Sequence, residues 1–145
     1  MKVSIEEISK EKIEEIIIRC YEVNDDIIKI LNKLKTDRNE LLGYDNDVIH
    51  RLNFQDVYYI EAVDNKVFIY CKDQVFESKQ KLYELEELCK GKKFFRASKS
   101  YIINLSKISF VKPSLSGRFE AKMDNGESIF ISRQFVPVLK NLLGL

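Results

Sequence analysis

The sequence predicts a mainly β protein of the α+β class, with small antiparallel sheets, short accessory helices and a small ββα unit at the N-terminus. Three observations lead to this. Short segments that alternate apolar with polar residues recur between residues 57 and 131 and are bounded by turn residues. Asn125-Gly126, between two of them, is typical of a β-hairpin. Helical periodicity is confined to short stretches.

The first forty residues are predicted to form strand, strand and helix. Val3 and Ile5 alternate with polar residues, and Ile16–Ile18 is typical of a short buried strand. Asn24 is expected to cap a helix with the apolar face Ile27, Ile30, Leu31 and Leu34. Residues 1–40 are too few to bury this face alone, so we expect a dimerisation or regulatory element that docks on the rest of the chain or on a second copy. The polar stretch Thr36–Glu40 indicates the boundary.

Residues 46–145 are predicted to form the second domain. Short strands are expected from Val48 onward, with His50 in a strand or its approach. The further expected strands are 57–63, 67–71, 74–76, 94–96, 101–104, 119–124 and 128–131, with a turn at Asp64-Asn65-Lys66. One helix is expected to follow Ser78 as its cap and to end before Gly91, with Leu82, Leu85, Leu88 and Cys89 inward. A last helix is expected over about 134–143, with Phe135, Leu139 and Leu142 inward.

Composition and motifs exclude several classes of protein. With 45% hydrophobic and 32% charged residues, no long apolar run and no apolar leader, the chain is expected to be soluble, globular and cytoplasmic. Its three cysteines lie far apart, which favours reduced thiols over a zinc site. The single histidine, His50, has no partner at motif spacing, and no nucleotide-binding or hydrolase motif is present. We therefore expect no enzymatic activity, cofactor or small-molecule substrate.

The charge is strongly segregated along the chain. The net charge is +1, yet residues 90–145 hold 11 Lys/Arg against 3 Asp/Glu. Such a basic segment indicates a polyanionic partner such as nucleic acid. Pairing of this segment with the acidic middle of the same fold is the alternative that the residues leave open.

Three positions are candidates for reading DNA bases. Arg133 follows a predicted strand directly, and its planar guanidinium matches guanine O6 and N7. Lys99 lies between Ser98 and Ser100 in a short connection, and hydroxyl and ammonium donors together suit phosphate oxygens and base edges. Asn65 could read adenine or simply form its turn. An exposed arginine that pairs with a carboxylate is the alternative for Arg133. Other cations, Arg118 among them, would supply a surrounding positive field.

The segment KKFFRASKSYIIN resembles the central signature of the LytTR family, the DNA-binding domains of bacterial transcription regulators. The matching pieces are Phe95-Arg96, Ser98-Lys99, Ser100-Tyr101 and Ile102-Ile103-Asn104, with Ser132-Arg133 before the closing helix. The resemblance covers roughly residues 46–145. It implies an elongated fold of three small antiparallel sheets whose loops enter successive major grooves of double-stranded DNA. Base contacts would come from Lys99, Arg133, Asn65 and Lys66, and phosphate contacts from Lys93, Arg96, Ser98, Ser100 and Arg118.

We expect a transcriptional regulator that binds repeated half-sites as a homodimer, since the C-terminal segment is basic and presents Lys99 and Arg133. Many family members carry a receiver domain, for which the N-terminal residues are too few, so a stand-alone regulator is expected. Its control would come from dimerisation, from its abundance or, by analogy alone, from a membrane-bound regulatory protein. The alternative function is a protein-interaction module whose basic face binds an acidic partner.

Overall fold

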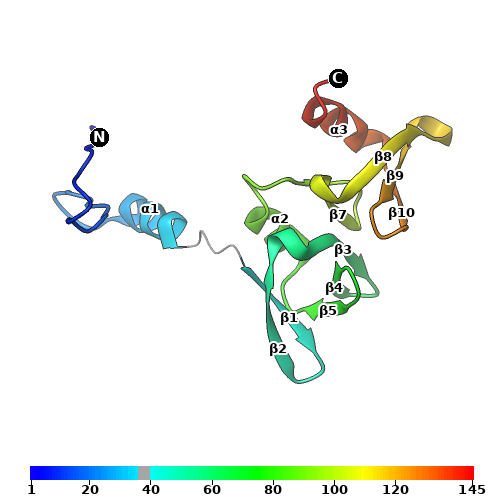
Figure 1. Ribbon diagram of the computed structural model, residues 1–145, viewed down its shortest axis with the longest axis horizontal. Coiled ribbons are helices and arrows are strands. Elements are labelled where there is room, and N and C mark those ends of the chain that lie inside the picture. Colours follow the sequence, from blue (N-terminus) through cyan, green and yellow to red (C-terminus); the bar gives the residue numbers. More distant parts are fainter. Residues whose placement is uncertain (36–39) are drawn as a thin grey trace. The chain divides into compact units, whose positions relative to one another are not determined.

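The computed structural model describes residues 1–35 and 40–145 (Figure 1). The chain forms two compact units, residues 1–37 and 38–145. The expected boundary at Thr36–Glu40 lies outside the described residues, except for Glu40, which begins a strand.

In the described part of the first unit, the one regular element is helix α1 (Asp25–Lys35). Its predicted cap is confirmed, because Asn24 Oδ1 accepts a hydrogen bond of 3.0 Å from the Ile27 amide. The two strands expected before it are wrong, since residues 1–23 contain only a hydrogen-bonded turn between Ser9 and Lys12. An isolated pair of strands is at best marginally stable, and the described residues of the first unit offer no partner strand to the apolar run at Ile16.

The described residues of the second unit, 40–145, form two sheets in which every strand pair is antiparallel. The larger has the order β2-β1-β5-β4-β3-β7-β6 and the smaller the order β10-β9-β8, so there are two sheets where the resemblance implied three. Their strands are β1 (Glu40–Asp45), β2 (Val48–Asn53), β3 (Val57–Val63), β4 (Lys66–Cys71), β5 (Val75–Ser78), β6 (Phe94–Arg96), β7 (Tyr101–Asn104), β8 (Ile108–Pro113), β9 (Phe119–Met123) and β10 (Ser128–Ile131).

Two short α-helices accompany these sheets, α2 (Leu82–Leu88) and α3 (Val136–Leu142). Single 3₁₀ turns join consecutive strands, namely η1 (Phe54–Asp56), η2 (Leu105–Lys107) and η3 (Leu115–Gly117), and η4 (Arg133–Phe135) joins β10 to α3. The mainly β architecture with accessory helices is therefore as predicted. The strands β1 and β8 were not among the predicted ones.

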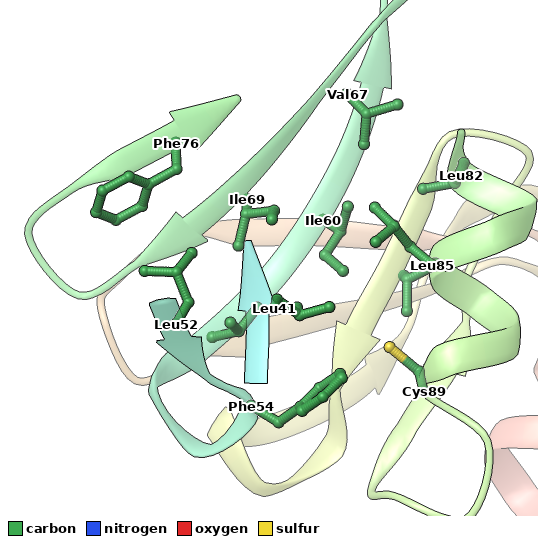
Figure 2. Close-up of a cluster of buried hydrophobic side chains, with 12 residues drawn as sticks. Leu41, Leu52, Phe54, Ile60, Val67, Ile69, Phe76, Leu82, Leu85 and Cys89 are labelled. Atoms are coloured by element: carbon green, nitrogen blue, oxygen red, sulfur yellow. The ribbon is translucent and has the colours of Figure 1, made fainter. Parts of the chain in front are cut away.

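A first hydrophobic core lies between the larger sheet and α2 (Figure 2). Leu85 is fully buried in it, and Leu82 and Cys89 lie on the same face of the helix, as their spacing predicted. The turn η1 contributes Phe54. The sheet contributes Leu41, Leu52, Val57, Ile60, Val67, Ile69, Phe76 and Ile102.

A second core lies on the other face of β3 and β7 and includes the smaller sheet and α3. β3 supplies Ile60 to the first core and Tyr59 to the second, while β7 supplies Ile102 and Ile103 in the same way. This alternation buries both faces of the β3–β7 pair. It places the connection between β6 and β7 next to the smaller sheet, where residues Phe95 and Ala97 are buried.

Two details of the predicted helices are wrong. Ser78 is the buried last residue of β5, where its Oγ accepts a hydrogen bond from the Gln80 amide, and Lys81 occupies the N-cap of α2 instead. Leu142 is exposed and Val136 is buried. The 3₁₀ turn η4 delays the start of α3 to Val136, which rotates the inward face to Val136 and Leu139.

Candidate nucleic-acid interface

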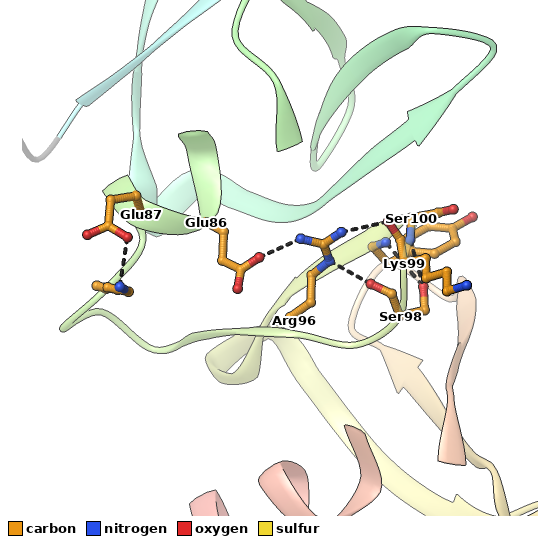
Figure 3. Close-up of polar contacts among 8 residues, drawn as sticks. Glu86, Glu87, Arg96, Ser98, Lys99 and Ser100 are labelled. Carbon is orange, nitrogen blue, oxygen red and sulfur yellow. Dashed lines mark hydrogen bonds and ion pairs between the residues drawn. The ribbon is translucent and has the colours of Figure 1, made fainter. Parts of the chain in front are cut away.

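The connection Ser98–Ser100 between β6 and β7 has a well-defined backbone. Ser98 Oγ accepts hydrogen bonds of 3.2 Å from the amides of Ser100 and Tyr101, and the Ala97 amide donates to the Tyr101 carbonyl at 2.9 Å. Lys99 is exposed at the centre of this connection. Its side chain extends away from Arg96 in Figure 3. The loop therefore holds an ammonium group outward on an ordered backbone.

Arg96, at the end of β6, binds the same loop from the inside. Its Nε donates to the Ser98 carbonyl at 2.6 Å and its Nη2 to the Lys99 carbonyl at 2.7 Å. Its Nη1 forms an ion pair with Glu86 of α2 (Figure 3). Only 22% of the Arg96 side chain is exposed. The phosphate contact expected of Arg96 stays a prediction, since these bonds show only that the guanidinium holds the loop.

The Arg133 segment adjoins this loop, although 34 positions separate it from Lys99 in the sequence. The Ser132 amide donates a 2.9 Å hydrogen bond to the Ala97 carbonyl, which joins the end of β10 to the start of the loop. Arg133 itself is exposed at the first position of η4. Within the described residues, neither Arg133 nor Lys99 pairs with a carboxylate. The structure thus places the two strongest candidate base readers, Arg133 and Lys99, on neighbouring segments, and neither forms an ion pair within the described residues.

The side chain of Arg133 rests on the connection between β8 and β9. A Cβ added to Gly117 would lie 2.9 Å from Arg133 Cδ and 3.1 Å from its Cγ. Gly117 has a φ of +75°, a conformation that a residue with a Cβ adopts only under strain. A glycine here leaves room for the alkyl chain of Arg133 to lie along the backbone.

The third predicted site is the turn between β3 and β4. Asp64 and Asn65 have φ values of +51° and +63°, as the two central residues of a type I′ hairpin turn do, and Lys66 begins β4. Asn65 and Lys66 are both exposed. The turn is connected to the Lys99 loop through β3, because the Ala62 amide donates a 2.8 Å hydrogen bond to the Ser100 carbonyl.

A cluster of tyrosines on β3, β4 and β7 surrounds Glu61. Its carboxylate accepts hydrogen bonds from the hydroxyls of Tyr101 at 2.8 Å and Tyr70 at 3.0 Å, and Tyr59 stacks on Tyr70 with ring centroids 4.4 Å apart. Burial raises the pKa of Tyr59 to about 12. Burial, followed by the bond to Glu61, also raises the pKa of Tyr101. The sequence analysis missed this cluster, because only the pairing of β3 with β4 and β7 brings its members together.

The remaining predicted phosphate contacts surround this region to different degrees. Lys93 is exposed just before β6, and Ser100 is half-buried with its carbonyl occupied by Ala62. Arg118 is exposed, and its guanidinium carbon lies 4.7 Å from the centre of the Phe130 ring. Ser98 uses its hydroxyl within the loop. Their contacts with phosphate stay predictions.

Two further findings concern other kinds of site. In residues 1–35 and 40–145, no helix combines the length and apolar character needed to cross a bilayer. The same residues contain no group of three or more His, Cys, Asp or Glu side chains that could hold a metal ion.

A β fold that carries unpaired, exposed cations on adjoining loops defines a protein class suited to binding a polyanion. Residues 47–144 match the model of the LytTr DNA-binding domain. This match spans more than half of the chain, which therefore belongs to the LytTR family of DNA-binding domains.

Similar proteins include transcriptional regulators and a sensory transduction protein. The chain is 28% identical over 147 residues to an uncharacterised HTH-type transcriptional regulator of Staphylococcus aureus strain MSSA476, covering 100% of this chain and 99% of that protein. It is 25% identical over 99 residues to the sensory transduction protein LytT of Enterococcus faecalis, covering 68% of this chain but 41% of that protein. A solved structure, the LytTr DNA-binding domain of a protein described as a methyl-accepting/DNA response regulator from Bacillus cereus, matches with a TM-score of 0.71 and 28% identity, over 74% of this chain and 99% of that one.

Proposed function

We propose that this protein is a transcriptional regulator that binds double-stranded DNA sequence-specifically and reads the major groove through its loops. The observation that carries the proposal is the hydrogen bond from the Ser132 amide to the Ala97 carbonyl. It joins the segment of Arg133 to the loop of Lys99, and both cations are exposed without a carboxylate partner in the described chain. Membership of a DNA-binding family supports the same function.

Each candidate base reader has a hydrogen-bonding group that suits particular base edges in the groove. The Arg133 guanidinium can donate two parallel hydrogen bonds to guanine O6 and N7. Lys99 presents a single ammonium that donates to guanine or to phosphate oxygens. Asn65 can bind adenine N6 and N7, and Lys66 follows it as a further donor. The proposed phosphate contacts are Lys93, Ser98, Ser100 and Arg118. The phosphate contact predicted for Arg96 competes with a second role, positioning of the Lys99 loop, and variants of Arg96 and Glu86 distinguish the two.

The proposed mode of binding is through loops and not through a helix pair. Between residues 40 and 145, α2 and α3 are separated by five strands, so this segment has no helix-turn-helix motif. The S. aureus relatives are nevertheless named HTH-type regulators. We propose that the protein acts in the bacterial cytoplasm as a homodimer on repeated half-sites, with residues 1–40 as the dimerisation or regulatory element.

Selection of bound sequences from a random pool of duplexes tests this proposal. An enriched motif is expected, and repeats of it would give the half-site spacing. Sequence-blind binding at all salt concentrations would contradict specific recognition and favour an acidic protein partner instead.

An arginine variant then tests the base-reading role. Arg133→Ala should cost about 1–3 kcal/mol of binding to the selected site and relax the preference at one base position. Arg51→Ala is the matched control, because it removes the same charge from the edge strand β2, where Arg51 pairs with Glu40. Fluorescence anisotropy on duplexes with single base-pair changes measures both variants. Wild-type base preferences in Arg133→Ala would refute the assigned role.

A further inference from the structure

Arg96 and Glu86 form a link between helix α2 and the Lys99 loop. The Arg96 guanidinium binds the carbonyls of two consecutive loop residues on one side and the Glu86 carboxylate on the other (Figure 3). We infer that Arg96 and Glu86 are positioning residues for DNA reading: together they set the backbone of the loop and so the direction in which Lys99 meets a base. This inference rests on the proposed function.

The link runs from helix α2, which is packed in the core, to the exposed side chain of Lys99. α2 is anchored in the first core by Leu85, which is fully buried, and by Cys89. Glu86 follows Leu85 directly and points from the helix toward Arg96, as Figure 3 shows. A rigid element of the core therefore holds the guanidinium, and the guanidinium holds the loop. The Lys99 ammonium forms no ion pair with a carboxylate among the described residues.

The chemistry of the guanidinium is what makes the link possible. Its planar fork presents donors in several fixed directions, and here Nε, Nη1 and Nη2 each bind a different oxygen. An ammonium carries the same charge on a single nitrogen and cannot span the same three acceptors. Arg96→Lys therefore separates the two roles that Arg96 could have. A phosphate contact needs chiefly the charge, while a positioning residue needs the fork.

Removal of Glu86 also distinguishes the two roles of Arg96, because each role predicts a different change in DNA binding. A carboxylate that competes with phosphate for Arg96 would weaken DNA binding, so its removal would raise affinity for every sequence. If Glu86 instead positions the loop, its removal would lower the preference for the base read by Lys99 and would not raise the affinity for every sequence. Glu87 is a matched control on the same helix, because it pairs with Lys90 at 2.7 Å and has no bond to the loop. Glu86→Ala and Glu87→Ala change the net charge equally.

The experiment measures affinities of the full-length chain for the selected duplex and for its single-base variants, at several salt concentrations. Arg96→Lys and Glu86→Ala are expected to lower the preference at the base read by Lys99 by about 5- to 20-fold, part of the discrimination that one good base contact provides. The preference at the Arg133 position and the slope of affinity against salt should stay as in wild type. Glu87→Ala should match wild type throughout.

Three results would overturn the inference. One is a wild-type base preference in both Arg96→Lys and Glu86→Ala. A second is a Glu86→Ala variant that binds all duplexes more tightly, with a salt slope steeper by about 0.9, which would make Arg96 a phosphate contact that Glu86 restrains. A third is equal loss of specificity in Glu87→Ala. If the wild-type chain itself shows no base preference, the proposed function fails, and this is seen before any variant is compared.

A second measurement covers the case in which a variant is too unstable to bind DNA. Hydrogen exchange of the free protein should show faster exchange at the amides of Ser100 and Tyr101 in Glu86→Ala, because both amides bond to Ser98 Oγ within the positioned loop. Exchange there as slow as in wild type, while the rest of the chain is destabilised, would also contradict the inference.

Discussion

Gly117 offers a way to move Arg133 without changing it. Gly117 has a φ of +75° and its backbone lies against the Arg133 side chain. Gly117→Ala adds a Cβ 2.9 Å from Arg133 Cδ, closer than real side chains approach, so the guanidinium must shift. Gly91→Ala is the matched control, because Gly91 has a φ of +77° and no atom within 4 Å of the added Cβ.

Both variants carry the backbone strain of alanine at a positive φ, and only Gly117→Ala also affects DNA reading. In each, alanine in the left-handed region costs roughly 1–2 kcal/mol. The loss of unfolded-state freedom offsets about 0.4–1 kcal/mol of this, so each should be destabilised by about 1 kcal/mol. Only Gly117→Ala also displaces Arg133. It should therefore lose up to the ~1–3 kcal/mol of discrimination expected for one bidentate contact to guanine.

Thermal unfolding and fluorescence anisotropy together check this prediction. Both variants should melt a few degrees below wild type, roughly 4–8 °C for a domain of about this size. Gly117→Ala alone should lose preference at the base position that Arg133→Ala identifies, and it should keep the preference at the Lys99 position. Equal base preferences in Gly117→Ala and Gly91→Ala would refute the reasoning that Gly117 aims Arg133.

Two further predictions concern stability. Asn104 is buried, donates to the Val57 carbonyl at 2.8 Å and accepts from the Ser106 amide at 3.0 Å. Asn104→Ala should therefore lower the free energy of unfolding in urea by about 2–4 kcal/mol, and a loss well under about 1 kcal/mol would contradict this. The pKa of Tyr59, raised to about 12 by burial, means that the folded chain keeps this proton to a higher pH than the unfolded chain, whose tyrosines titrate near 10. Its contribution to stability is complete below about pH 10 and lost as the pH rises toward about 12. The urea midpoint should fall over that range, and less steeply in Tyr59→Phe; identical slopes in the two proteins would show that Tyr59 is not responsible.

Local patterns in the sequence were sufficient for many elements of the fold. Alternation and turn residues predicted the hairpin of β3 and β4, and Asp64 and Asn65 adopt the positive φ values that such a turn requires. The spacing of Leu82, Leu85 and Cys89 predicted the buried face of α2. These features depend on residues within one or two turns of each other, which a sequence displays directly. The strands expected near Val3 and Ile16 are wrong, because a strand needs a partner that local alternation does not supply.

The sequence by itself determined the family signature, the exposed cations and most of the strands of residues 46–145. Only the tertiary structure decided which of these residues meet. Tyr101 binds Glu61 across 40 residues of chain, and Ser132 binds Ala97 at the edge of the Lys99 loop. The phosphate contact expected of Arg96 stays a prediction, and only the structure shows that its guanidinium binds Glu86 and the loop carbonyls. The physical reason is that a side chain's partners are set by strand pairing and core packing between distant segments, and the type of residue alone does not specify them.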